Sequence, residues 1–290
     1  MFLADKWTEY QLIDTADGEK LEYWGKFLLR RPDPQAIWSV KSEKSRWTKT
    51  DATYHRSQSG GGKWQFFNKH LPEAWQIHYR DLTFNIKPMG FKHTGLFPEQ
   101  AVNWDWFSEL IRNAGRPIQV LNLFAYTGGA TVAALNAGAS VCHVDASKGM
   151  VTWAKENVVA SGLENRPVRY IVDDVVKFVR REGRRGRKYD AIIMDPPSYG
   201  RGPSGEVWKI EDELYPLILD CMEILSDRPL FFLINSYTTG LSVQILTNVL
   251  TLTMKAKYGG KVTADEIGLP IQSNGLVLPC GISGRWENSR

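Results

Sequence analysis

The sequence predicts an α/β protein in which a doubly wound, largely parallel sheet follows a small β-rich or mixed module. Beyond Pro98, short apolar segments alternate with segments of helical period, which is typical of parallel βαβ units. Before residue 90, aromatic residues and turn formers prevail, with strand-like pieces at 24–31 and 77–87 and no long helical period. We therefore expect two domains, 1–90 and 91–290, the first of which could contribute to substrate binding.

Apolar spacing predicts each element of the second domain. Trp104, Phe107 and Ile111 share one face of a first helix, and Gly162 is placed to end a later one. The predicted helices are 101–114, 128–139, 149–163, 175–183, 210–225 and a segment near 240–257. The predicted strands are 118–125, 140–146, 169–174, 189–195 and 229–237, followed by 261–269 and 275–287 as a closing antiparallel pair. This order predicts a sheet of seven strands.

Composition limits the class of protein. The 290 residues are 43% hydrophobic and carry a net charge of +4, without an apolar run long enough to cross a bilayer and without an export signal. The three cysteines have no paired spacing, which favours a reducing compartment over disulfides or a zinc site. We expect a cytoplasmic protein with no membrane partner and no metal; the pattern does not determine its oligomeric state.

Basic residues gather in two places. One is a short stretch that could steer a polyanion or could simply be a solvated loop; it contains Arg180, Arg181, Arg184, Arg185, Arg187 and Lys188. The other is the segment 41–70, where basic and aromatic residues surround a serine- and glycine-rich run at 57–62 that predicts a flexible loop or a disordered tip.

Ligands of open α/β sheets bind beyond the carboxyl ends of the strands. The first strand leads into Gly128-Gly129 directly before a helix, where a tight turn and free amides favour an anionic group; a plain tight turn is the alternative. Asp145 ends the second strand, seventeen residues after Gly128, at a spacing suited to binding a ribose; the alternative is a cap on the next helix.

Further acids follow the next two strands. Asp173 and Asp174 end the third, and we favour Asp174 as an acceptor for an adenine amino group because it directly precedes a helix, with Asp173 left open. Asp195-Pro196-Pro197-Ser198-Tyr199 follows the fourth strand, and its two prolines predict a stiff turn with carbonyls pointing outward. A carboxylate, a carbonyl and an aromatic ring together suit a planar group that bears an amine. A rigid turn without chemistry is the alternative.

These motifs resemble a known family, the S-adenosylmethionine (SAM)-dependent methyltransferases related to the bacterial large-subunit (23S) ribosomal RNA methyltransferases. The motifs are N-L-F-A-Y-T-G-G-A-T at 122–131, V-D-A-S at 144–147, D-P-P-S-Y-G-R-G at 195–202 and F-K-H-T-G-L-F-P-E-Q at 91–100. The resemblance implies a Rossmann-like seven-stranded methyltransferase sheet, SAM as the cofactor and ribosomal RNA as the partner. It covers the chain from about Phe91 to its end.

The residue pattern and the resemblance together assign residues to roles. The catalytic set is Asp195, Pro196, Pro197 and Tyr199. The cofactor-binding set is Phe97, Gln100, Asn122, Phe124, Ala125, Tyr126, Thr127, Gly128, Gly129, Asp145, Ala146, Ser147, Asp174 and Asp195. For Phe97 and Gln100, packing of the joint between domains is the alternative role.

One departure from the family bears on the reaction. Relatives that methylate carbon-5 of cytosine place a nucleophilic cysteine in an S-C-S sequence after the fifth core strand, where this chain has Asn235-Ser236-Tyr237-Thr238. Because carbon-5 needs a transient adduct with a thiolate, we expect direct transfer to a nitrogen or oxygen.

Other functions fit the sequence less well. The substrate could instead be a protein or a small molecule. The sequence lacks the G-x-G-x-x-G motif that a nicotinamide oxidoreductase would have. If the protein only bound RNA without catalysis, Asp145, Asp174 and the double-proline turn would have no role.

Overall fold

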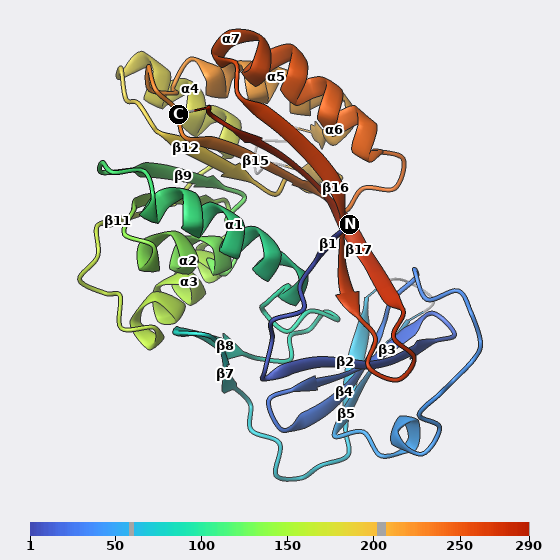
Figure 1. The fold of residues 1–290 in the computed structure, drawn as a ribbon. Helices are drawn as coiled ribbons and strands as arrows, with labels where there is room; N and C mark the ends of the chain where they lie inside the picture. Colours follow the sequence, from blue (N-terminus) through green and yellow to red (C-terminus); the bar gives the residue numbers. More distant parts are fainter. Residues whose placement is uncertain (58–60, 202–206, 290) are drawn as a thin grey trace. The chain divides into compact units, whose positions relative to one another are not determined.

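The computed structural model describes residues 1–57, 61–201 and 207–289. The chain divides into two compact units, coloured along the sequence in Figure 1. The large unit holds Met1, 103–266 and 281–290, and the small unit holds 2–102 and 267–280. The closing pair of strands therefore runs through both units.

The large unit contains the predicted parallel sheet. Its five parallel strands stand in the order β15 (Phe231–Ser236), β12 (Ala191–Met194), β9 (Gln119–Leu123), β10 (Ser140–Asp145) and β11 (Val168–Val172). Next to β15 runs β17 (Val277–Glu287), antiparallel to it, and then β16 (Lys261–Pro270). The predicted fold class is confirmed, and the seven predicted strands are joined by a short eighth strand, β1 (Phe2–Leu3), beside β16.

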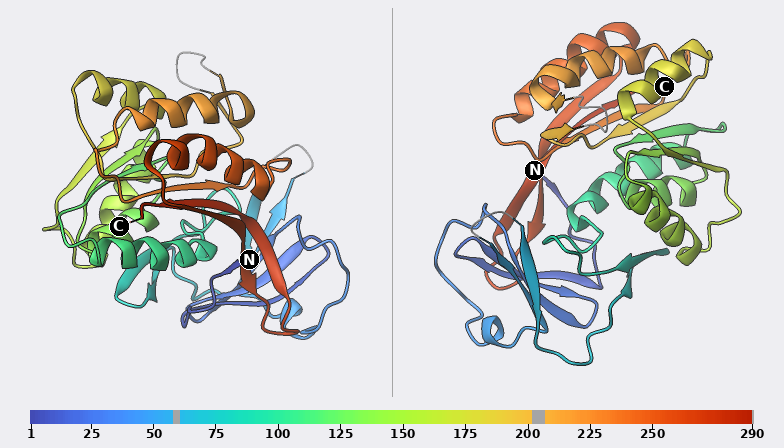
Figure 2. Two further views of the ribbon diagram at one scale, coloured as in Figure 1. Left: turned by 45° about the horizontal axis from the view of Figure 1, so that its top comes forward. Right: turned by 180° about the vertical axis from the view of Figure 1, so that it is seen from behind.

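Helices cover both faces of this sheet (Figures 1 and 2). One face carries α1 (Ala101–Arg112), α2 (Gly129–Asn136) and α3 (Lys148–Ala160). The other carries α4 (Val175–Arg184), α5 (Ile210–Met222) and α6 (Val243–Leu250), which continues through a π-helical stretch, Thr251–Lys255, into α7 (Ala256–Tyr258).

Alternation along the strands builds the core, because neighbouring residues of a strand face opposite sides of the sheet. Phe231 lies against Phe107 of α1, with ring centroids 5.7 Å apart, whereas Phe232 is buried in the cluster formed with α4, α5 and α6. Both rings are fully buried. Such burial on two faces is why β12 is apolar throughout and β15 is apolar over its first four residues.

One hairpin of the large unit has no counterpart among the predicted elements. Strand β13 (Tyr199–Arg201) pairs antiparallel with β14 (Val207–Lys209), directly after the double-proline turn. Gly202, the last residue of the D-P-P-S-Y-G-R-G motif, lies outside the described residues.

The small unit is β-rich, as predicted. Its main sheet has the order β2 (Tyr10–Ala16), β3 (Glu19–Trp24), β4 (Phe27–Pro32), β5 (Ala52–Arg56) and β6 (Gly62–Phe66). A separate hairpin joins β7 (Trp75–Tyr79) to β8 (Leu82–Ile86). Short 3₁₀ turns occupy Arg46–Thr48 and Pro98–Gln100, and β1 (Phe2–Leu3) pairs with residues 267–268 of β16.

Both strand-like pieces of the small unit contain a tight turn. The piece at 24–31 bends where Trp24 pairs with Phe27 and Gly25 takes a φ of 63°. The piece at 77–87 bends at Arg80, which has a φ of 52°. Residues 58–60 of the predicted flexible run lie outside the described residues.

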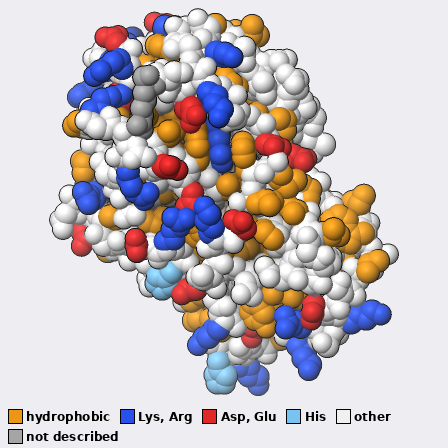
Figure 3. Space-filling view, in the orientation of Figure 1, with side chains coloured by type: hydrophobic (Ala, Val, Ile, Leu, Met, Phe, Trp, Pro, Cys, Tyr) orange, Lys and Arg blue, Asp and Glu red, His pale blue; other side chains and the backbone are white. Residues whose placement is uncertain are grey.

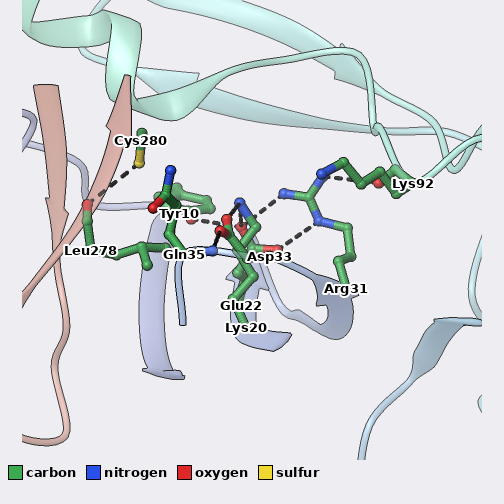
Figure 4. Close-up of polar contacts among 9 residues, drawn as sticks. All are labelled: Tyr10, Lys20, Glu22, Arg31, Asp33, Gln35, Lys92, Leu278 and Cys280. Carbon is green, nitrogen blue, oxygen red and sulfur yellow. Dashed lines mark hydrogen bonds and ion pairs between the residues drawn. The ribbon is translucent and has the colours of Figure 1, made fainter. Parts of the chain in front are cut away.

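A buried ion network holds the strands of the small unit together (Figure 4). The Glu22 carboxylate accepts hydrogen bonds from Nε of Arg31 at 2.7 Å and from the Tyr10 hydroxyl at 2.7 Å. Burial opposes ionisation of Glu22, but the charges of Arg31 and Lys20 outweigh it and lower its pKa to about 2. Glu22 is thus an anion buried in the unit.

Candidate functional site

The carboxyl ends of the parallel strands of the large unit lie level with one another. The register pairs Leu123 with Val144 and with Met194, and Met194 with Ile234. The residues that follow these positions therefore meet at one edge of the sheet; they are Phe124, Asp145, Asp195 and Asn235, with Asp173 one strand further on. The sequence-predicted acids are brought together there.

The loop between β9 and α2 has an unusual backbone. Phe124, Tyr126 and Gly128 all have positive φ, at 54°, 51° and 82°. Non-glycine residues adopt such angles at a cost of about 1–2 kcal/mol each, so surrounding contacts must hold them. Ala125 N–H donates to the Val144 carbonyl at 3.0 Å, and the Thr127 carbonyl accepts from the Asn157 side chain at 2.8 Å. The loop is strained and fixed, as binding sites often are.

Gly128 fits its position for two reasons. Its φ of 82° disfavours a side chain, and a Cβ built there would lie 2.9 Å from the Cβ of Ala154 on α3. The loop therefore packs closely on α3, while its backbone, with Gly129 as the first residue of α2, presents the helix start at the edge of the sheet. Glycine is needed here because both the backbone angle and the close approach to α3 exclude a side chain.

Asp145 fastens the same loop. One carboxylate oxygen accepts from the Tyr126 N–H at 2.8 Å and the other from the Ser147 N–H at 2.8 Å. Ser147 itself caps α3, accepting from the Met150 N–H at 3.4 Å, and Ala146 is exposed beside it. Since a carboxylate has about four acceptor positions, these two bonds leave capacity for the hydroxyls of a ligand.

Asn122 lies below the edge, in a buried polar chain that sequence reasoning missed. Its side-chain amide donates to the Thr131 hydroxyl at 3.0 Å, and that hydroxyl lies 2.8 Å from Nδ1 of His143. Burial lowers the pKa of His143 to about 4, and a hydrogen bond with the Tyr126 backbone opposes this shift only in part. His143 is therefore neutral near pH 7, and the chain ties the strand to the start of α2.

This neutral histidine makes stability depend on pH. Its pKa falls from about 6.5 in the unfolded chain to about 4 in the folded one, so below pH 6.5 the unfolded state binds the extra proton. The free energy of unfolding therefore has its full value above pH 6.5 and decreases by about 3 kcal/mol as the pH falls to 4.

Replacing His143 with asparagine, which keeps an acceptor for Thr131 but does not titrate, should flatten this dependence. We expect His143→Asn to be less stable than the wild type at pH 7 and to lose less stability between pH 6.5 and pH 4. Urea unfolding at both pH values measures the difference. His93, whose pKa burial also lowers to about 4, contributes to both proteins alike; equal pH slopes would contradict the assignment to His143.

The two acids after β11 are both engaged by the protein. Asp173 forms an ion pair with Arg181, and Asp174 caps α4 by accepting from the Lys177 N–H at 2.9 Å. The feature that favoured Asp174 in the sequence, its place before a helix, thus has a structural role. Which acid faces a ligand stays a prediction.

The double-proline turn is fixed by residues from beyond it. The Pro197 carbonyl accepts from the indole N–H of Trp208 at 2.6 Å, and Ser198 bonds to Thr238 through their hydroxyls at 2.6 Å. The Trp208 ring also lies 5.3 Å from that of Phe124, joining the turn to the glycine loop. The sequence pattern gives no sign that Trp208 lies near this turn. The pairing of β13 with β14 places it there.

Tyr199 and Pro196 differ in exposure. Tyr199 opens β13 and is 50% exposed, whereas Pro196 is buried. An exposed ring that directly follows this fixed turn suits a planar ligand, for which stacking is available on one side.

The end of β15 is held by a second buried network. The side-chain Nδ2 of Asn103 donates to Oδ1 of Asn235 at 3.0 Å, and Nε of Arg285 donates to the side-chain Oδ1 of Asn103 at 2.9 Å. Burial lowers the pKa of Arg285 to about 10, with Glu287 opposing. Asn235 is therefore structural here, although it stands where the sequence pattern placed the fifth strand end.

Two predicted groups are not among the residues that follow these strands. Phe97 and Gln100 belong to the small unit, so their assignment to the cofactor stays a prediction. Much of the basic stretch on α4 is used within the large unit: Arg180 pairs with Asp220 at 2.8 Å and Arg185 with Glu182 at 3.5 Å. On the face drawn in Figure 3, Lys and Arg side chains lie in separate groups.

Comparison with known proteins decides the family. A family described as S-adenosylmethionine-dependent methyltransferase matches residues 44–214. The chain belongs to this family. A crystal structure of the SAM-dependent methyltransferase from Agrobacterium tumefaciens is 38% identical, with a TM-score of 0.93, covering 99% of this chain and 93% of that one. A Streptococcus mutans protein described as a SAM-dependent methyltransferase shares the fold, with a TM-score of 0.74 at 21% identity over 97% of this chain and 76% of that one.

Curated relatives of this methyltransferase match over a shorter region. The ribosomal RNA large subunit methyltransferase K/L of Shewanella frigidimarina is 29% identical over 171 residues, 58% of this chain and 23% of that protein. That of Shewanella baltica is 27% identical over 195 residues, 66% of this chain and 26% of that protein. The chain spans about a quarter of the length of these relatives.

The site of the methyltransferase fits its cofactor, SAM. Gly128 lets the loop pack closely on α3 at the start of α2, and Asp145 keeps acceptor capacity at the neighbouring strand end. In the described residues, no group of three or more His, Cys, Asp and Glu is arranged to hold a metal. Over the same part of the chain, no helix is long and apolar enough to span a membrane.

Proposed function

We propose that this methyltransferase transfers the methyl group of SAM to a nitrogen or oxygen of a ribosomal RNA nucleotide, in the cytoplasm. The observation that carries the proposal is the Asp195-Pro196-Pro197 turn, fixed at the end of β12 beside the glycine loop and followed by the exposed ring of Tyr199. The names of the curated relatives support RNA as the polymer.

The loop and the strand ends would hold the cofactor. The start of α2 at Gly129 suits its carboxylate, and Asp145 suits its ribose hydroxyls. Asp174, or Asp173 in its place, suits the adenine amino group. Phe124, Ala125, Tyr126 and Thr127 line the same loop, and Ala146 and Ser147 follow Asp145.

The chain's own residues would orient the substrate. When bound, SAM supplies a methyl group activated by a positively charged sulfur, so alignment of the two reactants is the main task left to the protein. Asp195 accepts a hydrogen bond from the acceptor amine, the Pro196 carbonyl accepts a second, and Tyr199 stacks on the base. Trp208 keeps this turn rigid through the Pro197 carbonyl. A base within RNA has to be splayed out to enter.

The cysteines support nitrogen or oxygen over carbon-5 of a pyrimidine. Burial raises the pKa of Cys142 and of Cys221, which lie within β10 and α5. Cys280 belongs to the small unit. Within the described part of the large unit, no cysteine thus stands at a strand end to supply the thiolate that carbon-5 chemistry needs.

Mapping of modified nucleosides tests the proposal. Ribosomal RNA from cells with and without this gene is digested and analysed by mass spectrometry. We expect one methylated nucleoside, modified on nitrogen or oxygen, to be missing without the gene and to return with the wild-type gene. Identical maps would reject ribosomal RNA and favour a protein or small-molecule substrate.

A further inference from the structure

An exposed aromatic surface lies on the small unit, and none of its residues has been assigned a role above. It consists of Arg56 on β5, Trp64 and Phe66 on β6, and Phe91 and Lys92, and we call it the β6 surface. Alternate residues of a strand share a face, so Trp64 and Phe66 lie on one face of β6. Arg56 pairs with Gly62 and therefore belongs to the same face.

The rings of this surface are arranged for stacking. Trp64 and Phe66 are stacked, with centroids 6.4 Å apart and planes 23° apart. Phe66 is 56% exposed and Phe91 is 64% exposed. The buried ring of Tyr54 supports Trp64 edge-on at 5.6 Å. Exposed rings in this arrangement are costly to leave in water and are typical of binding surfaces.

The surface is held in place before any ligand binds. The Trp64 indole N–H donates to the Phe91 carbonyl at 3.1 Å, joining β6 to the segment that contains Lys92. Arg31 donates to the Lys92 carbonyl at 3.0 Å, as Figure 4 shows, and is itself fixed by the buried Glu22. Such preorganisation lowers the entropy lost on binding.

Positive charge accompanies the rings. Arg56 is exposed at one end of the surface. Burial lowers the pKa of Lys92, and the charges of Lys20, Arg56 and Arg31 lower it further, with Asp33 opposing. Lys92 thus lies in a positive potential, which an anionic ligand would relieve.

We propose that the β6 surface binds single-stranded RNA, with bases stacked on Trp64, Phe66 and Phe91 and phosphates bound by Arg56 and Lys92. Aromatic rings interleaved with cations are how proteins bind single strands. The inference rests on the proposed function, since it takes RNA as the substrate. It assigns to the small unit the capture of the strand that carries the target nucleotide.

Binding of a labelled oligonucleotide tests this surface. Fluorescence anisotropy is measured for the full chain with a fluorescein-labelled 12-nucleotide oligouridine and with the same strand in a duplex with oligoadenosine. We expect tighter binding of the single strand, and about tenfold weaker binding by Phe66→Ala. Arg56→Ala should reduce the slope of log Kd against log salt by about 0.7.

A matched control lies on the same strand. Gln65 belongs to the opposite face of β6, where it bonds His55 at 2.9 Å, so Gln65→Ala should bind RNA as the wild type does. SAM binding by calorimetry should be equal in all these proteins, which shows that they are folded.

Equal affinity of Phe66→Ala and the wild type would overturn the inference, as would equal affinity for duplex and single strand or no binding of the single strand. Because β6 ends its sheet, self-association of the chain without RNA binding would also overturn it, in favour of pairing between two copies. None of these outcomes alters the nucleoside map, which tests the proposed function separately.

Discussion

Asp195→Ala is expected to abolish methyl transfer while SAM still binds with an affinity within about tenfold of the wild type. The carboxylate follows β12 at the edge of the sheet, in a turn that Trp208 and Thr238 hold from two sides. Its removal leaves that scaffold in place. A group that acts on the reacting amine contributes about a hundredfold to a thousandfold to the rate, so we expect a loss of at least this size in kcat.

The measurement is single-turnover transfer of a labelled methyl group to unmodified ribosomal RNA, with SAM affinity from calorimetry. Asp212→Ala is the control, because Asp212 is an exposed acid in the first turn of α5 and its removal changes the net charge equally. A large loss of SAM affinity with unchanged kcat would move Asp195 from the acceptor to the cofactor. Unchanged turnover would reject both roles.

The sequence predicted the positions of the acids because each follows an apolar run that ends abruptly. A buried strand must stop where a charged or strongly turning residue begins, and parallel strands end at the same edge. Asp145 and Asp195 could therefore be assigned to one edge from spacing alone, and the register agrees. What each acid contacts depends on backbone amides, which carry no sequence signal.

Contacts between distant segments were beyond the sequence pattern. Trp208 reaches the Pro197 carbonyl only because three residues on each side pair as β13 and β14, and such short strands show no periodicity. The tip of the closing hairpin, 267–280, likewise belongs to the small unit, where Ser273 bonds to Asp14 at 2.9 Å. Local pattern determines an element's type, whereas the partner of that element depends on the whole chain.

Gly128→Ala should weaken SAM binding by at least about tenfold, because two separate costs fall on the loop that we propose binds the cofactor. At a φ of 82° a side chain costs about 1–2 kcal/mol. The new Cβ would also lie 2.9 Å from that of Ala154, and overpacking of this kind costs about 1–3 kcal/mol. The loop can relieve both only by moving, which takes the Tyr126 amide away from Asp145.

A second substitution separates the two costs. Ala154→Gly removes the Cβ that the new side chain meets but leaves the φ unchanged, so Gly128→Ala with Ala154→Gly should recover part of the affinity for SAM. Ala154→Gly alone destabilises α3 by about 1 kcal/mol and should bind SAM normally. Calorimetric titration of the three variants gives the comparison. Full recovery in the double variant would show that packing on α3, and not the left-handed backbone, is what requires glycine; wild-type affinity in Gly128→Ala alone would mean that the cofactor does not depend on the shape of this loop.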